Sequence, residues 1–153
     1  MAVIIYISST YEDLKDQREA VYKALRRLNH DARAMEDYVA TDARPLDKCL
    51  KDVVAADLYL GIFAWRYGVV PTKDNPQGHS ITEREYRHAV ECSKPCLIFL
   101  LHEDADWKPK FLDAVTASDK GGASGRCAPN WRTTARSASF EASKNWRSSR
   151  VRP

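Results

Sequence analysis

The chain has 153 residues, of which 44% are hydrophobic, and this fits one soluble domain with a proper core. Its formal net charge of +3 is uneven, because the segment from Ala123 onward carries +6 and residues 1–122 carry −3. The folded part therefore lacks the basic surface of a nucleic-acid-binding protein, so no nucleic acid is expected as a partner. No apolar run approaches the ~20 residues that span a bilayer, so no membrane is expected either.

The beginning of the chain resembles a strand more than a signal peptide, because Met1–Ile7 has no charged n-region and no cleavage site. This predicts a cytoplasmic protein. The four cysteines, Cys49, Cys92, Cys96 and Cys127, form no Cys-x-x-Cys pair and have no histidine at zinc spacing. We expect free thiols, no metal and no cofactor.

The first half of the chain predicts two strands and two helices. Val3–Ile7 is a continuous apolar, β-branched run, typical of a strand buried on both faces. Ser9-x-x-Glu12 has the form of a capping box and predicts a helix that starts there. One apolar stripe of that helix contains Leu14, Val21, Leu25 and Leu28. Ala32–Glu36 predicts a short strand, and Pro45 opens a second helix.

The second half repeats the alternation. Asp57–Ala64 predicts a third buried strand, and Trp65–His79 is a long loop rich in Gly, Pro and polar residues. Ser80-x-x-Glu83 is a second capping box, which starts a helix that ends near residue 92. Cys96–Leu101 is the fourth strand.

Strands that alternate with helices indicate βαβ units, a parallel sheet and right-handed crossovers with helices on both faces. We therefore predict an α/β fold with a flavodoxin-like, doubly wound sheet in residues 1–110. Ligands of such sheets bind outside the carboxyl ends of the strands. This rule selects three segments for a shared site, namely Ser8–Tyr11, Trp65–Gly68 and Ser80–Glu85.

Residues 111–153 differ in composition from the rest. From Ala123 to Pro153 there is one aliphatic β-branched residue, Val151, and no Leu, Ile or Met. One interpretation is a disordered basic tail, which leaves the fold incomplete at its C-terminal part. The other is a frame-shifted translation of a helical segment, since Asn130-Trp131 and Asn145-Trp146 both become leucine in the frame one nucleotide back.

Glu85 is the candidate catalytic residue. It lies four residues after Ile81 and four before Ala89, which places it on the inward side of the predicted helix. Burial of a carboxylate there is unfavourable unless it has a charged or hydrogen-bonding partner or a functional role. The alternatives are a ligand or catalytic role and a structural ion pair with Arg18 or Arg66.

The other candidates surround the same edge of the predicted sheet. The turn after the first strand offers the hydroxyls of Ser8, Ser9 and Thr10. They either bind an anion such as phosphate at a helix start or only cap the helix. The exit of the third strand offers Trp65, Arg66, Tyr67 and Gly68. An aromatic pair with an arginine suits a base and a phosphate, but equally suits anchoring the loop or contacting another domain.

The helix start adds Ser80, Thr82 and Glu83 as ligand-binding candidates, although the capping box alone explains Glu83. Asp57 stands at the beginning of its strand, about 20 Å from the opposite end, and we expect a turn or cap role for it. His79 borders the site without a histidine partner in the sequence pattern.

Three stretches occur in order at sensible spacing. They are ISSTYEDLKDQREA from Ile7 to Ala20, ADLYLGIFAWRYG from Ala56 to Gly68, and SITEREY from Ser80 to Tyr86 with Lys94-Pro95-Cys96 after it. Together they resemble the bacterial family named domain of unknown function 4062, over roughly residues 3–107. We expect the chain to depart from the family from Trp107 onward.

The resemblance implies a fold similar to TIR domains and nucleoside deoxyribosyltransferases. Family members often stand at the N-terminus of larger proteins with a signalling-type NTPase or repeat domains, and some are linked to anti-phage defence. It therefore implies a signalling or interaction module that binds a nucleotide, has such domains as partners in cis or in trans, and forms a homo-oligomer.

A more distant resemblance suggests chemistry. Thr82-x-x-Glu85, Ala89 and Lys94-Pro95 are similar to the deoxyribosyltransferase pattern in which that glutamate attacks the anomeric carbon, and TIR-type NAD hydrolases use a glutamate nearby. Breaking an N-glycosidic bond develops oxocarbenium charge that a buried carboxylate stabilises or captures. The alternative function is thus a nucleotide N-glycosidase acting on NAD or nucleosides. The Gly-Thr that opens the pattern is replaced here by Ser80-Ile81-Thr82.

Overall fold

A computed structural model describes residues 2–34, 46–102 and 104–111 of the chain. Its four strands form one parallel sheet in the order β2-β1-β3-β4. The strands are β1 (Ile4–Ser8), β2 (Asp31–Arg33), β3 (Leu58–Phe63) and β4 (Cys96–Leu100). The predicted flavodoxin-like α/β architecture is confirmed.

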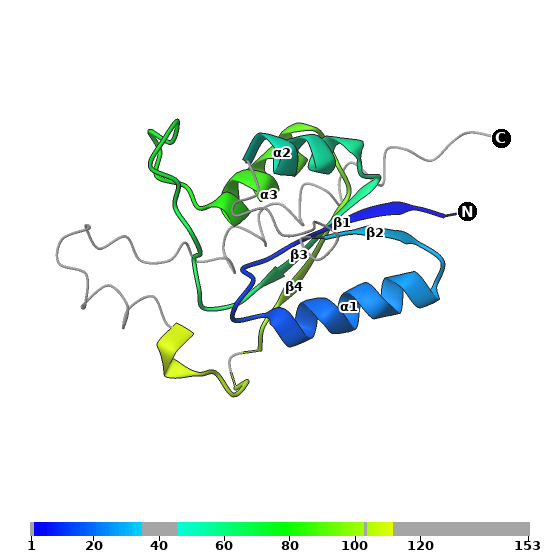
Figure 1. Cartoon of the computed structure of the whole chain (residues 1–153), viewed down its shortest axis with the longest axis horizontal. Coiled ribbons are helices and arrows are strands. Elements are labelled where there is room, and N and C mark those ends of the chain that lie inside the picture. The colour runs from blue at the N-terminus through cyan, green and yellow to red at the C-terminus, as the bar shows by residue number, and fades with distance from the viewer. Residues whose placement is uncertain (1, 35–45, 103, 112–153) are drawn as a thin grey trace.

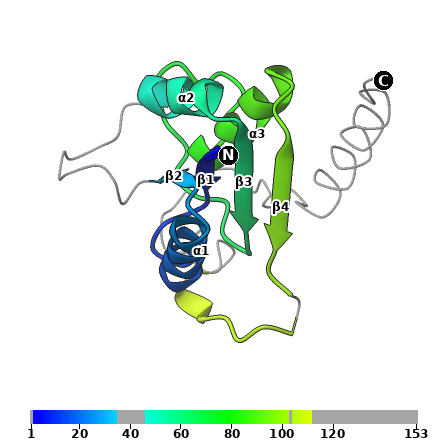
Figure 2. The ribbon, with the colours of Figure 1, turned by 90° about the vertical axis from the view of Figure 1, so that its right-hand side faces the viewer.

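Among the described residues, three α-helices cover the two faces of the sheet (Figure 1). Helix α1 (Lys15–Arg27) lies on one face, and α2 (Leu46–Ala55) and α3 (Ile81–Glu91) lie on the other. A short 3₁₀ turn, η2 (Pro109–Phe111), follows β4 near the beginning of α1 (Figure 2). Strands β1 and β3 are buried on both faces, as their apolar sequences predict.

The alternation of side chains along β1 divides the core into two layers. Ile5 and Ile7 pack on the α1 face with Leu14 and Leu60. Tyr6 packs on the opposite face, in a layer that contains Val53, Ala56, Tyr59, Phe63, Tyr86 and Ala89. Because side chains alternate with period two, Ser8 points to the same face as Tyr6. The last residue of β1 thus presents its hydroxyl to α3.

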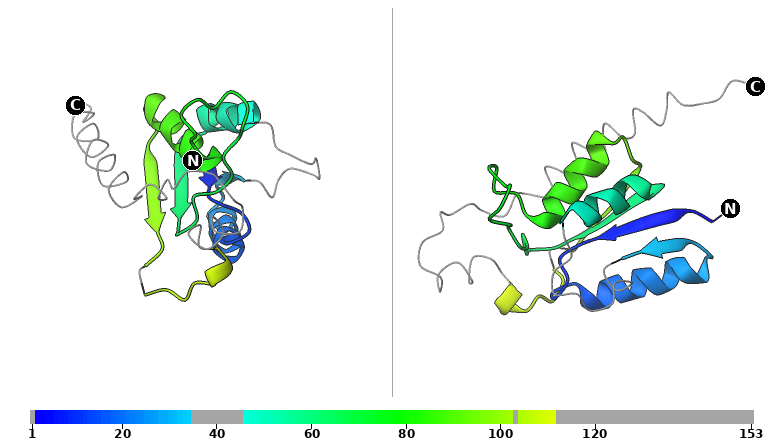
Figure 3. Two further views of the ribbon diagram at one scale, coloured as in Figure 1. Left: turned by 90° about the vertical axis from the view of Figure 1, so that its left-hand side faces the viewer. Right: turned by 45° about the horizontal axis from the view of Figure 1, so that its top comes forward.

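The carboxyl ends of the strands meet at one edge of the sheet. Ser8 is in register with Gly61 of β3, and Phe63 is in register with Leu100 of β4. The loop of residues 64–80 leaves β3 at this edge and leads into α3 (Figure 3). All three segments selected from the sequence therefore lie at this edge.

The structure corrects both predicted capping boxes. Helix α1 begins at Lys15 with Leu14 as its N-cap residue and without a side-chain cap, so the box at Ser9 is wrong. The Ser9 hydroxyl donates instead to the carbonyl of Thr10, at 2.7 Å. The argument for an anion at a helix start therefore does not apply to the Ser8–Thr10 turn.

The second box is half formed. Ser80 caps α3 by accepting a hydrogen bond from the Glu83 amide at 3.2 Å. The return bond from Glu83 is replaced, because the Ser80 amide donates to the Tyr67 hydroxyl at 3.1 Å. The hydrogen bond from the Ser80 amide to Tyr67 thus connects the start of α3 to the long loop.

Two predictions concern features that the structure describes only in part. Within the described ranges, no helix has the length and apolar character needed to cross a membrane. The described cysteines Cys49, Cys92 and Cys96 form no disulfide bond with one another. The predicted basic tail lies outside the described residues except for Phe111, so its two interpretations stay predictions.

Candidate functional site

Glu85 of α3 is a buried carboxylate held by two hydroxyl groups of β1. Only 5% of the residue is exposed. The Tyr6 hydroxyl donates to Oε1 at 2.7 Å, and the Ser8 hydroxyl donates to Oε2 at 2.6 Å. Hydrogen bonds from two side chains of one strand fix the orientation of the carboxylate.

The surroundings of Glu85 contain no basic partner in the described part of the chain, so the predicted ion pair with Arg18 or Arg66 is not formed. The nearby Tyr59 is buried. Burial, and next the charge of Glu85, raises the pKa of Tyr59 well above its usual value. Tyr59 therefore stays protonated beside the carboxylate.

The turn after β1 is tied to helix α1. Arg18, which is 2% exposed, donates to the Ser9 hydroxyl at 2.8 Å. The Thr10 hydroxyl donates to Oδ2 of Asp13 at 2.7 Å. These contacts hold the two hydroxyl oxygens in defined positions beyond the end of β1.

Arg66 joins this turn from the exit of β3. Its guanidinium lies 3.7 Å from Oδ1 of Asp13, whose side chain is fully buried. It also lies 6.0 Å from the centre of the Phe111 ring. The Arg66 side chain is 31% exposed, so part of it is in contact with solvent at this edge.

Gly68 brings the three segments into direct contact. Its φ angle of 95° lies in the region that favours glycine. A Cβ atom on Gly68 would lie 2.9 Å from Cγ2 of Thr10 and 3.7 Å from Oγ1 of Thr82. The loop backbone thus packs between the β1 turn and the start of α3.

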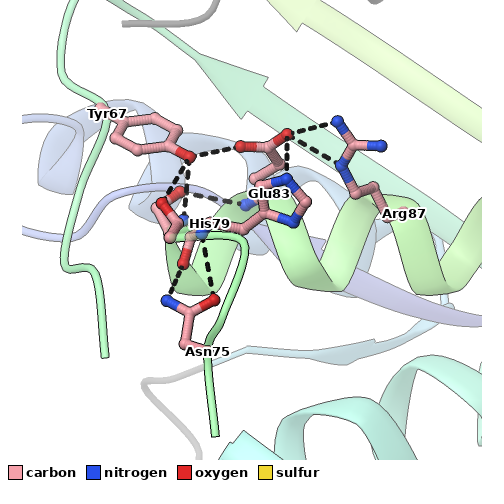
Figure 4. A network of polar contacts seen from close by, with 7 residues as sticks. Tyr67, Asn75, His79, Glu83 and Arg87 are labelled. Carbon is pink, nitrogen blue, oxygen red and sulfur yellow. Dashed lines mark hydrogen bonds and ion pairs between the residues drawn. The ribbon is translucent and has the colours of Figure 1, made fainter. Parts of the chain in front are cut away.

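Glu83 belongs to a separate polar network on the loop side of α3 (Figure 4). Its carboxylate accepts from the Tyr67 hydroxyl and from Nε of Arg87 at 2.8 Å. His79 Nε2 lies 3.6 Å from the same carboxylate. Burial, and next the bond to Glu83, raises the pKa of Tyr67.

The family of the chain is shown by a comparison with family models. The model described as Domain of unknown function (DUF4062) matches residues 4–146. The chain belongs to the DUF4062 family. The match extends well beyond Trp107, where we expected the resemblance to end. No curated protein matches the chain.

The remaining predicted residues of this DUF4062 domain differ in their surroundings. Ser80 and Thr82 are buried at the start of α3, and Trp65 is half-buried. Asp57 lies at the opposite end of the strands and caps the beginning of β1, because its Oδ2 accepts from the Ile4 amide at 2.9 Å. This contact agrees with the structural role expected for Asp57.

Sequence reasoning missed three residues of the candidate site. Tyr6 could have been recognised because it interrupts the apolar run Val3–Ile7 with a hydroxyl group, two positions before Ser8. Arg18 interrupts the apolar stripe of α1 between Leu14 and Val21. Asp13 follows Thr10 by three residues, the spacing of a local side-chain contact.

A groove elsewhere on the domain contains none of these residues. It has a volume of about 420 Å³ and is lined by Asp47, Leu50, Lys51, Val54 and His88, between α2 and α3. In the described ranges, no group of three or more His, Cys, Asp or Glu residues could hold a metal ion. The polar edge around Glu85 remains the best candidate for ligand chemistry.

Proposed function

We propose that this domain is a TIR-like signalling or interaction module of a bacterial regulatory or defence system, and that it binds a nucleotide at the carboxyl edge of its sheet. The packing of Gly68 between Thr10 and Thr82 carries the proposal, because it joins all three edge segments. Ligands of open parallel sheets bind at this edge.

The side chains at this edge suit the parts of a nucleotide. The partly exposed Arg66 side chain provides guanidinium donors for a phosphate. The half-buried Trp65 provides an aromatic surface for a base. The signalling role rests on the family resemblance, and the expected partners are an NTPase or repeat domain and a second copy of the chain.

Binding of NAD, ADP-ribose and ATP to the full chain, measured by isothermal titration calorimetry, tests the proposal. Arg66→Ala is expected to weaken binding about tenfold or more, because it removes a charged hydrogen-bond donor. Arg84→Ala is the matched control, since Arg84 contacts the carbonyl of Asp74 at an exposed place. Absence of binding to all three ligands, or equal effects of the two variants, would contradict the proposal.

A second candidate function is a nucleotide N-glycosidase that acts on NAD or a nucleoside. The orientation of Glu85 by Tyr6 and Ser8 favours it, because each carboxylate oxygen keeps a second lone-pair site. In that reaction the bond between the anomeric carbon and the base nitrogen breaks, and the electron pair leaves with the base. The Glu85 carboxylate stabilises or captures the oxocarbenium, and water or another acceptor completes the transfer.

Release of nicotinamide or base, measured by chromatography, tests this second function. Glu85→Gln is expected to abolish release while the fold persists, because the amide oxygen still accepts from Tyr6. Glu91→Gln is the control on the same helix, with 73% of its side chain exposed. If the wild-type chain releases no base at high protein concentration, the glycosidase function is contradicted and only the proposed nucleotide binding remains.

A further inference from the structure

The first two turns of α3 carry two buried carboxylates that contact different neighbours. Glu83 and Glu85 are each 5% exposed. Two positions along a helix correspond to a rotation of about 200°, so the two side chains leave the helix in nearly opposite directions. Glu85 contacts β1, whereas Glu83 contacts Tyr67 of the loop of residues 64–80. Glu83 therefore attaches this loop to the helix.

Tyr67 is the residue through which the attachment acts. Its hydroxyl donates to Glu83 and accepts from the Ser80 amide at 3.1 Å. A second attachment lies just beyond, where the Ile81 amide donates to the carbonyl of Val69 at 2.9 Å. Gly68, which packs against Thr10, lies between these two attachments along the chain.

The outer part of the loop is closed by a different residue. Asn75 Nδ2 donates to the carbonyls of Pro71 and His79, both at 2.9 Å. Asn75 Oδ1 accepts from the His79 amide at 3.1 Å (Figure 4). The Asn75 bonds thus close the outer loop without Glu83 or Tyr67 atoms. Two longer contacts also reach it, because the Tyr67 hydroxyl lies 3.4 Å from the Gly78 carbonyl and His79 Nε2 lies 3.6 Å from the Glu83 carboxylate.

We propose that Glu83 is a positioning residue of the edge site. Acting through Tyr67, it holds the loop so that Gly68 stays against Thr10 and Arg66 stays near Asp13. Tyr67, Arg87 and His79 surround the Glu83 carboxylate, so we expect Glu83 to act on a ligand through the loop and not by direct contact. The consequence for ligand binding rests on the proposed function, whereas the hold on the loop does not.

Amide hydrogen exchange of the ligand-free full chain tests whether Glu83 and Tyr67 hold the loop of residues 64–80 against α3. The variants are Tyr67→Phe, Glu83→Ala and Glu83→Gln. Exchange at the Ile81 amide is expected to accelerate about tenfold or more in Tyr67→Phe and Glu83→Ala, since each removes a hydrogen bond to a charged group. Glu83→Gln keeps an acceptor oxygen for Tyr67 and is expected to restore most of the protection. Exchange at the His79 amide is expected to accelerate much less than at Ile81, because this amide donates to Oδ1 of Asn75.

Two controls separate this effect from a general loss of stability. Tyr22→Phe removes a tyrosine hydroxyl whose contact is with the exposed Arg26, and Glu91→Ala removes an exposed carboxylate of α3. Neither is expected to change exchange at Ile81. Unchanged exchange at Ile81 in Tyr67→Phe and Glu83→Ala would overturn the proposal, and so would equal acceleration at His79.

Nucleotide affinity then tests the link to the ligand site. For a nucleotide that the wild-type chain binds, the affinity is expected to fall several-fold in Glu83→Ala and to recover in Glu83→Gln. Faster exchange at Ile81 with unchanged affinity would overturn the positioning role. If the wild-type chain binds no nucleotide while exchange accelerates as stated, the proposed function fails and the hold on the loop is supported.

Discussion

The hydroxyl of Tyr6 lies 2.7 Å from Oε1 of Glu85 and joins two residues that are 79 positions apart in the sequence. Ser8 makes the second bond from the same strand. Both donors reach one carboxylate because residues two apart in a strand share a face. The first strand therefore contributes side chains to the core and also donates both hydrogen bonds that hold the candidate catalytic residue.

Tyr6→Phe is expected to lower the free energy of unfolding by about 1–3 kcal/mol, because it leaves a buried carboxylate with one hydrogen bond fewer. Urea denaturation measures the effect. Tyr59→Phe is the matched control in the same layer, since the Tyr59 hydroxyl lies near Ser8 and Glu85 but has no partner at normal hydrogen-bond geometry among the described residues. Equal losses in the two variants would show that the Tyr6 hydroxyl has no special role.

Gly68→Ala is expected to lower the free energy of unfolding by about 1–3 kcal/mol and to displace the loop. The φ angle of 95° is unfavourable for alanine, and the new methyl group would lie 2.9 Å from Cγ2 of Thr10. Urea denaturation measures the loss.

Thr10→Ser provides the test of this mechanism. It removes Cγ2 and keeps the hydroxyl that donates to Asp13. The double variant is expected to recover part of the loss, because the close contact disappears while the backbone strain remains. A strictly additive double variant would mean that strain alone explains the effect.

The fold and the edge of the site could be predicted because they follow from strong local patterns. The apolar runs of β1 and β3 predict buried parallel strands, and their carboxyl ends must meet at one edge. The inward position of Glu85 followed from its spacing to Ile81 and Ala89. These arguments need only helical and strand periodicity.

The partners of the candidate residues could not be predicted, because they depend on tertiary contacts. The sequence pattern at Ser9 fits a capping box, yet α1 begins at Lys15. The Ser9 hydroxyl instead accepts from Arg18, one helical turn inside α1. Likewise, the return bond predicted for Glu83 is displaced by Tyr67, which approaches from a loop 16 residues away. The local sequence around a helix start does not show which side chain from a distant segment will form a hydrogen bond there.

A variant of Asp57 distinguishes the structural role of this acid from the proposed catalytic role of Glu85. Asp57→Ala is expected to lower the free energy of unfolding by about 1 kcal/mol, because the Ile4 amide loses its acceptor at an exposed place. Nucleotide affinity and any base release are expected to stay at the wild-type level. Chemical denaturation and calorimetry measure the two effects. A loss of binding or activity in a stably folded Asp57→Ala protein would place Asp57 in the site.

Cys96 makes stability depend on pH in the alkaline range. Burial raises the pKa of its thiol from 9.0 to about 11. The folded protein thus keeps the proton more tightly than the unfolded chain, so the free energy of unfolding falls as the pH rises from about 9 toward 11. Because Cys96 is only partly buried, we expect a loss of at most about 1 kcal/mol between pH 8 and pH 10.

Urea denaturation at pH 8 and pH 10 checks this prediction. Cys96→Ser is expected to flatten the pH dependence, because a serine hydroxyl does not ionise in this range and can donate to the Lys94 carbonyl as the thiol does. Cys92→Ser, at the exposed end of α3, is the matched control and is expected to keep the wild-type slope. Tyrosines of the unfolded chain are about half ionised near pH 10. Tyr59 and Tyr67, whose pKa values are raised in the fold, therefore contribute to the slope that remains in Cys96→Ser. Identical slopes in the wild-type and Cys96→Ser proteins would assign the alkaline loss of stability to other groups.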